Sequence, residues 1–307
     1  MRFAWISYDW TKGSGVLRTA TAVSARSGTL SSVSPARCET GGNESFLLYI
    51  ERKNPMAKRV DPIGVFDSGV GGISVLRALI DKMPGENYLY FGDSANAPYG
   101  TRTPQEVTEL ACAVAEKLAN QGVKALVVAC NTSTAVAMEA LKARFPGMPI
   151  VGIEPSVGLA ASCYPEGRIG VMATPATIAG RRFMYQVEPY PNAKIDLIPA
   201  PNLVEIVEAG QYDTQVADDY LKNLLAPYIG KLDALVLGCT HYPFVKNALR
   251  RVLGENVAFF DGSSITAEET CRQLQASGLE NNNGGNVQIQ NSAEDKKLLE
   301  LSMKLLG

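Results

Sequence analysis

The fold class follows from residues 124–145, KALVVACNTSTAVAMEALKARF. An apolar run of strand length, 124–130, leads directly into a longer amphipathic segment, 133–145, with the spacing of a helix. The same alternation extends outward, from PIGVFD at 62–67 to MPIVGIE at 148–154. Short apolar strands that alternate with amphipathic helices predict βαβ units and a parallel sheet.

A second set of the same signals follows at a nearly constant offset. IGVFDS at 63–68 recurs as IGVMAT at 169–174, and ALVVACNT at 125–132 recurs as ALVLGCTH at 234–241. The repeat predicts an α/β protein of two homologous, open parallel-sheet (flavodoxin-like) domains that face each other across a cleft. Because ligands of open parallel sheets bind beyond the carboxyl ends of the strands, the residues after each apolar run are the candidates for function.

The first 55 residues differ from the rest of the chain. Residues 1–55 hold seven Lys or Arg against four Asp or Glu, with eight serines and no sustained periodicity. Met56 then opens MAKRVDPIGVFD, which has the form of a natural start. We therefore expect residues 1–55 to be a disordered or non-native extension, with a regulatory or targeting arm as the alternative.

Composition excludes several classes of function. The chain has 307 residues and a net charge of −2, so bulk charge does not attract a nucleic-acid backbone, and no nucleic-acid partner is expected. The single histidine, His241, excludes every metal site that needs two imidazoles, and no metal is expected. Six cysteines without a CxxC predict reduced thiols, and no apolar run reaches the ~18–20 residues of a membrane span. We expect a cytoplasmic protein without a membrane partner.

Two of the cysteines occupy positions that suit chemistry. Cys130 and Cys239 each end a buried strand and open a helix, where N–H groups and the helix dipole lower the pKa of a thiol from ~8.5. The repeat puts one of these thiols in each half, on opposite walls of the cleft. Such a pair suits racemisation, in which one base removes a proton from one face of a carbon and a second group returns a proton to the other face.

The polar residues near these thiols suit an amino-acid substrate. Turns with hydroxyls and backbone N–H groups hold a carboxylate, an ammonium needs an acceptor, and a distal carboxylate needs further donors. The residues predicted for these three tasks are, in that order, Asn131, Thr132, Thr240 and His241; Asp67 and Ser68; and Tyr99, through its hydroxyl, with Gly100, through its amide. Two alternatives stay open, a helix N-cap as the only role of Asp67 and a purely structural role for His241.

Taken together, these motifs resemble glutamate racemase, a family of cofactor-independent enzymes that interconvert L- and D-glutamate. The resemblance covers about residues 60–270 and is specific because the motifs occur jointly and in order. They are PIGVFDSGVGGISVLRAL (62–79), YFGDSANAPYG (90–100), VVACNTSTA (127–135), GIEPS (152–156), LVEIVEAG (203–210) and VLGCTHYPF (236–244).

The resemblance implies a role for five catalytic residues. Cys130 would be the base for the D-enantiomer and Cys239 the base for the L-enantiomer. Asp67 and His241 would assist the respective thiols and the substrate ammonium. Glu208 matches a third auxiliary acid near the second thiol, and no cofactor is expected.

The resemblance also implies domains and partners. Residues 56–154 with 262–307 would form the first α/β domain, and 155–261 the second. Family members supply D-glutamate for peptidoglycan synthesis, and hence for cell wall biogenesis and cell shape. They are often homodimers, and some respond to a nucleotide-linked cell-wall precursor as activator. The alternatives are an aspartate racemase, a non-catalytic amino-acid-binding module, and a metal-dependent phosphatase that uses Asp67.

Overall fold

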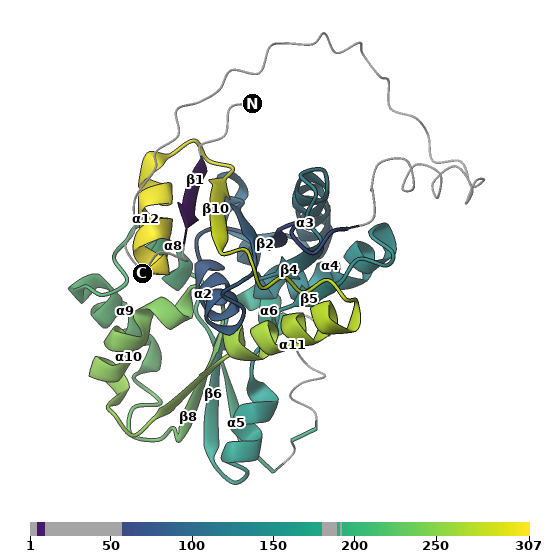
Figure 1. Cartoon of the computed structure of the whole chain (residues 1–307). Coiled ribbons are helices and arrows are strands. Elements are labelled where there is room, and N and C mark those ends of the chain that lie inside the picture. Colours follow the sequence, from purple (N-terminus) through teal and green to yellow (C-terminus); the bar gives the residue numbers. More distant parts are fainter. Residues whose placement is uncertain (1–4, 10–56, 180–188, 191) are drawn as a thin grey trace.

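The computed structural model describes residues 5–9, 57–179, 189–190 and 192–307, and these form two β-sheets with helices packed on both faces of each (Figure 1). All neighbouring strands are parallel except β1, which pairs antiparallel with β10. The prediction of two open parallel-sheet domains is confirmed. In spatial order, the first sheet contains β1 (Trp5–Asp9), β10 (Asn286–Asn291), β3 (Tyr88–Gly92), β2 (Ile63–Asp67), β4 (Ala125–Val128) and β5 (Ile150–Gly152), and the second contains β7 (Lys194–Pro199), β6 (Arg168–Ala173), β8 (Ala234–Gly238) and β9 (Ala258–Asp261).

Two apolar clusters fix the helices on the first sheet. One cluster joins the sheet to α2 (Ile73–Lys82), α11 (Ser263–Ala276) and α12 (Lys296–Leu306). The other cluster joins the opposite face to α3 (Pro104–Ala119) and α4 (Asn131–Arg144). Because the central strands are buried on both faces, their sequences are continuous apolar runs instead of alternating ones.

The second sheet is covered in the same way. Its main cluster packs α8 (Leu203–Glu208), α9 (Gln215–Leu225) and α10 (Lys246–Leu253) on one face, and a smaller cluster packs α5 (Val157–Cys163) on the other. The remaining elements are short: α6 (Pro175–Ala179) and the 3-10 helices η2 (Ser94–Asn96), η3 (Tyr99–Thr101) and η4 (Tyr242–Val245).

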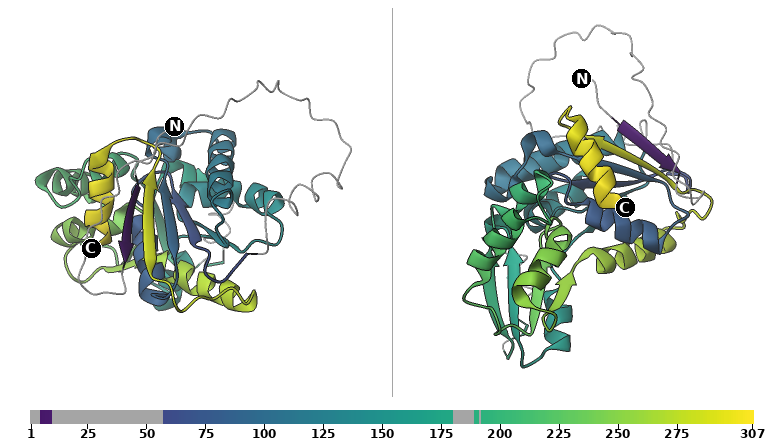
Figure 2. Two further views of the ribbon diagram at one scale, coloured as in Figure 1. Left: turned by 45° about the horizontal axis from the view of Figure 1, so that its top comes forward. Right: turned by 90° about the vertical axis from the view of Figure 1, so that its left-hand side faces the viewer.

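The chain passes from one sheet to the other and back. It leaves the first sheet after β5 and returns after β9, so that α11, β10 and α12 pack against the first sheet again (Figure 2). The predicted domains, with limits at residues 154 and 262, remain predictions. Of the segment 1–55, the structure describes only β1. The expectation for the rest of that segment lies outside the described residues.

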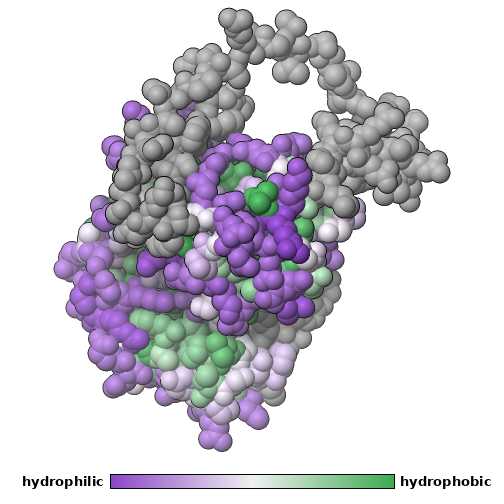
Figure 3. Space-filling model, in the orientation of Figure 1, coloured by the Kyte–Doolittle hydropathy of each residue, from purple (hydrophilic) through white to green (hydrophobic). Residues whose placement is uncertain are grey.

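Among the described residues, no helix combines the length and the apolar character that crossing a bilayer requires. Figure 3 shows polar side chains over most of one face, with an apolar area on the part of the molecule that carries the second sheet.

Candidate active site

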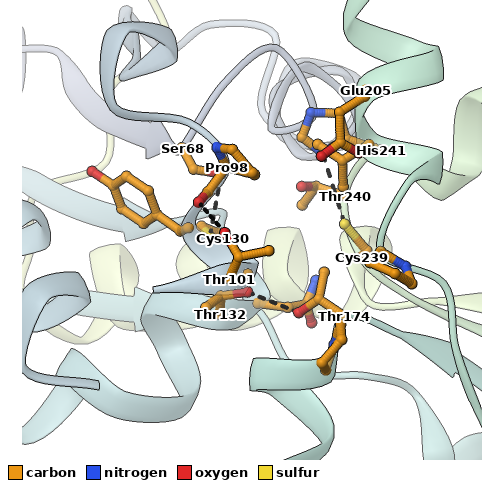
Figure 4. A pocket seen from close by; sticks show the side chains of 16 residues that line it. Ser68, Pro98, Thr101, Cys130, Thr132, Thr174, Glu205, Cys239, Thr240 and His241 are labelled. Carbon is orange, nitrogen blue, oxygen red and sulfur yellow. Dashed lines mark hydrogen bonds between the residues drawn. The ribbon is translucent and has the colours of Figure 1, made fainter. Parts of the chain in front are cut away.

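A pocket lies between the two sheets, beyond the carboxyl ends of the central strands β2, β4, β6 and β8. Figure 4 shows Cys130 and Cys239 directed toward it from opposite sides. Nine of the eleven predicted site residues line this pocket, and Asp67 and Glu208 do not. The complete lining is Ser68, Pro98, Tyr99, Gly100, Thr101, Cys130, Asn131, Thr132, Thr174, Pro175, Pro201, Val204, Glu205, Cys239, Thr240 and His241.

Cys130 forms the N-cap of α4, as its place after β4 predicts. Its Sγ accepts a hydrogen bond from the backbone N–H of Ser133 at 3.4 Å and lies 3.7 Å from Oγ of Ser68. The predicted lowering of the pKa is wrong for this thiol. Burial, reinforced by the nearby charge of Asp67, raises the pKa of Cys130 to about 11. Desolvation therefore outweighs the helix N-terminus, and Cys130 is a protonated thiol at neutral pH.

Cys239 has a different neighbour and enters a different kind of helix. It follows β8 and leads into the 3-10 helix η4, which continues into α10. Its Sγ lies 3.7 Å from Nδ1 of His241, whose Nε2 lies 2.8 Å from Oε1 of Glu208. Burial alone would lower the pKa of His241, but its hydrogen bonds to Cys239 and Glu208 raise that pKa well above its ordinary value. A protonated imidazole in this place donates to both neighbours, to Oε1 of Glu208 and to the sulfur of Cys239.

The two carboxylates that do not line the pocket lie behind its walls. Each is bonded across the boundary between the two sheets. Asp67, after β2, accepts a hydrogen bond from Oγ1 of Thr240 at 2.9 Å, whereas Glu208, on α8, accepts one from the backbone N–H of Val70 at 2.8 Å. Burial raises the pKa of Asp67, against the lowering effect of the charge on His241. Asp67 is also not the helix N-cap considered above, because α2 is capped by Gly72 without a side-chain bond.

The wall around Tyr99 differs from the prediction in one respect. The Tyr99 hydroxyl is buried and donates to Oδ2 of Asp93 at 2.6 Å, so it is not available to a distal carboxylate. By contrast, both polar side-chain atoms of Asn131 are buried and have no protein partner. An unpartnered buried amide in a pocket wall is costly unless a ligand or water bonds to it.

Seven of the sixteen lining residues are not among the predicted site residues, and three of these seven, Thr101, Thr174 and Glu205, have polar side chains. Thr174 was within reach of prediction, since it is the repeat counterpart of Ser68 and its hydroxyl lies 3.1 Å from that of Thr132 across the pocket floor. Glu205 is exposed on α8 and carries no sequence signal of its own. Within the ranges that the structure covers, no group of three or more His, Cys, Asp or Glu side chains is arranged to hold a metal ion.

Comparisons with known proteins agree with this site. The family model described as Asp/Glu/Hydantoin racemase matches residues 63–270. The chain belongs to this racemase family. A glutamate racemase of Clostridium perfringens is 44% identical over 249 residues, which cover 80% of this chain and 96% of that protein. The chain is therefore an enzyme, an isomerase of the glutamate racemase type.

Solved structures give the same assignment. The crystal structure of glutamate racemase from Francisella tularensis in complex with D-glutamate matches with a TM-score of 0.70 and 29% identity, and covers 81% of this chain and 94% of that one. Escherichia coli glutamate racemase, in complex with L-glutamate and the activator UDP-MurNAc-ala, matches with a TM-score of 0.65 and 31% identity over 70% of this chain and 83% of that one. The fold of this racemase, including the pairing of two parallel sheets, is thus a known one.

Proposed function

We propose that this racemase interconverts L- and D-glutamate without a cofactor, by deprotonation at one face of the α-carbon and reprotonation at the other. The observation that carries the proposal is the placement of two thiols, Cys130 and Cys239, on opposite walls of one pocket. A carbon held between them has one acid–base group on each face. This is the arrangement that inversion by two groups requires.

The two thiols have different surroundings, and this difference suits one distribution of protons between them in the resting enzyme. Cys239 is beside the imidazole of His241, whose pKa is raised, whereas the buried Cys130 is held as a thiol. In the resting enzyme, we propose, Cys239 removes the proton of L-glutamate and Cys130 donates a proton to the opposite face. For D-glutamate the roles are reversed, with Cys130 as base and Cys239 as acid. Asp67 supports the first thiol and His241, held by Glu208, supports the second.

Substrate binding follows from the polar atoms in the wall. The unpartnered amide of Asn131 and the hydroxyl of Thr132 offer donors to the α-carboxylate. Oγ1 of Thr240, whose proton is donated to Asp67, can accept from the ammonium. Ser68 and the backbone of Gly100 complete the predicted contacts, the latter toward the distal carboxylate. The ring of Tyr99 forms part of the pocket wall. Its hydroxyl does not bind the distal carboxylate, because it donates its hydrogen bond to Asp93.

The physiological role is proposed from the same assignment. D-glutamate is the product that peptidoglycan synthesis requires, and we infer that the enzyme supplies it in the cytoplasm as a homodimer. The five described cysteines are all free, which supports a reducing compartment. Because the Escherichia coli enzyme is described with a nucleotide-linked activator, we also propose such a cell-wall precursor as a candidate regulator.

The test is racemisation of each glutamate enantiomer, followed by circular dichroism after extensive chelation and without pyridoxal phosphate. We expect full loss of optical rotation with the wild-type enzyme. Cys130→Ser and Cys239→Ser should each lower racemisation in both directions by ~10²-fold or more, because the hydroxyl is a far weaker acid than a thiol. Cys112→Ser, remote from the pocket, is the matched control and should stay near wild type. Faster turnover of aspartate than of glutamate would instead favour an aspartate racemase.

A further inference from the structure

The turn that carries Cys239, Thr240 and His241 has one backbone carbonyl without its natural donor. In this 3-10 turn each carbonyl accepts from the N–H three residues later. Cys239 O accepts from Tyr242 N at 3.0 Å, and His241 O accepts from Phe244 N at 3.2 Å. The carbonyl between them, that of Thr240, would need the N–H of residue 243. That residue is a proline, which has none.

A side chain from the first sheet's helix α2 fills this gap. Oγ of Ser74 lies 3.0 Å from the Thr240 carbonyl oxygen, and also 3.0 Å from the carbonyl of Gly71. Ser74 is buried, with 9% of its surface exposed, and Thr240 is 3% exposed, so neither group can turn to bulk water for a partner. A buried carbonyl that loses its only side-chain donor is destabilised.

From these contacts we propose that Ser74 is a positioning residue for the acid–base couple of Cys239 and His241, acting through the backbone of Thr240. Ser74 belongs to the part of the chain that carries Cys130, yet it fixes the turn that carries the opposite thiol. Two further hydrogen bonds join the same regions, Val70 N to Glu208 and Thr240 Oγ1 to Asp67. The neighbouring Gly71 lets the turn approach, since a Cβ there would lie 2.3 Å from Nδ1 of His241.

The inference rests on the proposed two-thiol function, and its consequence is specific to one thiol. If the Thr240 carbonyl loses its donor, the turn can shift, and the 3.7 Å contact between Cys239 and His241 is no longer fixed. The reactivity of Cys239 should then change while that of Cys130, held by Ser133 and Ser68, stays the same. A general loss of packing would not select one thiol in this way.

The experiment compares Ser74→Ala with Ser302→Ala in the full chain. Ser302 is also a buried serine, 1% exposed, and its hydroxyl donates to Leu298 O within α12, remote from the pocket. For Ser74→Ala we expect kcat to fall about tenfold in both directions. We also expect the rate of Cys239 alkylation by iodoacetamide at pH 7, mapped by mass spectrometry, to fall at least about threefold, with an altered pH profile. Cys130 alkylation and all properties of Ser302→Ala should stay within about twofold of wild type.

A rescue variant makes the test independent of general stability. Pro243→Ala restores an N–H three residues after Thr240, so the double variant Ser74→Ala/Pro243→Ala should recover most of the lost kcat. If Ser74→Ala does not fold, Pro243→Ala is compared with the double variant, and the added substitution should change kcat less than twofold. Unchanged kcat and Cys239 reactivity in Ser74→Ala, or a double variant no better than the single one, would overturn the role of Ser74. A wild-type enzyme that does not racemise glutamate would overturn the proposed function instead.

Discussion

At the scale of single residues, the two thiols show that similar positions in a repeat can have different surroundings. Both follow a central strand, but Cys130 is beside a buried carboxylate and Cys239 is beside an imidazole. The helix N-terminus at Cys130 does not compensate for the loss of water around the thiol. The chemistry of each thiol is therefore set by side chains that other strands and helices supply.

The raised pKa of Cys130 predicts how its reactivity depends on pH. Because the pKa is about 11, the thiolate fraction should rise about tenfold per pH unit from pH 7 to 9, without a plateau. The rate of Cys130 alkylation by iodoacetamide, followed peptide by peptide, measures this fraction. Asp67→Asn removes a charge that raises the pKa of Cys130 and should speed its alkylation at pH 8. A plateau below pH 9 in the wild-type enzyme would contradict the assignment.

The residues of the site differ in whether their places could be predicted from the sequence. The strand-end positions of Cys130, Asn131, Cys239 and Thr240 were predictable, because the apolar runs are long and the repeat is regular. The places of Asp67 and Glu208 were not, since both side chains bond across the boundary between two sheets. The hydroxyl of Tyr99 was misassigned for a related reason. Its partner, Asp93, becomes a neighbour only when the loop after β3 folds back.

At the scale of elements, the loop between β2 and α2 packs closely against the turn after β8. Gly71→Ala tests this contact, since its Cβ would lie 2.3 Å from Nδ1 of His241 and 2.7 Å from Oγ1 of Thr240. We expect kcat to fall at least about tenfold as His241 is displaced from Cys239, with a change in melting temperature of only a few degrees. Gly147→Ala is the control for Gly71→Ala. Gly147 has a φ of +82° and open space around it, so alanine there should lower stability and leave kcat unchanged.

The opposite ends of the strands in the first sheet are held by a buried ion pair. Nζ of Lys124, just before β4, lies 2.5 Å from Oε2 of Glu86, just before β3, and also donates to the carbonyls of Arg59 and Leu279. Both charged side chains are almost fully buried, at 0% and 2% exposed. The pair thus ties together the starts of several strands, including the returning segment before β10.

Removal of this lysine should destabilise the protein without changing its chemistry. Lys124→Ala leaves Glu86 buried and unpaired, and should lower the free energy of unfolding by ~3–5 kcal/mol, as measured in urea. Well below the unfolding transition, kcat should stay near wild type, since the pair is at the far end of the sheet from the pocket. Arg272→Ala, which breaks an exposed pair with Glu269, should have little measurable effect. Equal effects of the two substitutions would contradict the account.

At the scale of the whole molecule, the two-sheet architecture could be predicted from the sequence. The edge strand β1 of the first sheet could not. The offset between matching strands implied two similar halves, and the parallel sheets confirm them. The strand β1 has no alternation that would separate it from the aperiodic residues around it. Its pairing with β10 depends on an edge that forms only once the C-terminal segment has returned.

A chain that starts at Met56 tests the contribution of the first 55 residues. The central strands, the pocket and all the residues proposed for catalysis lie beyond that point. We expect the shortened protein to fold and to racemise glutamate at a rate comparable to the full chain, although it loses the pairing of β1 and both tryptophans, Trp5 and Trp10. An insoluble or inactive product, beside an active full-length chain, would show that the segment is required.

The central claim is that two thiols act on opposite faces of one carbon, and proton exchange with solvent tests it most directly. Early turnover of L-glutamate, and separately of D-glutamate, is followed in deuterated water by NMR and chiral separation. The account predicts deuterium at the α-carbon of the product, while the remaining substrate keeps its hydrogen, because the thiol that removes the proton does not return one to the same face. Deuterium that enters the remaining substrate as fast as the product would contradict the two-thiol mechanism.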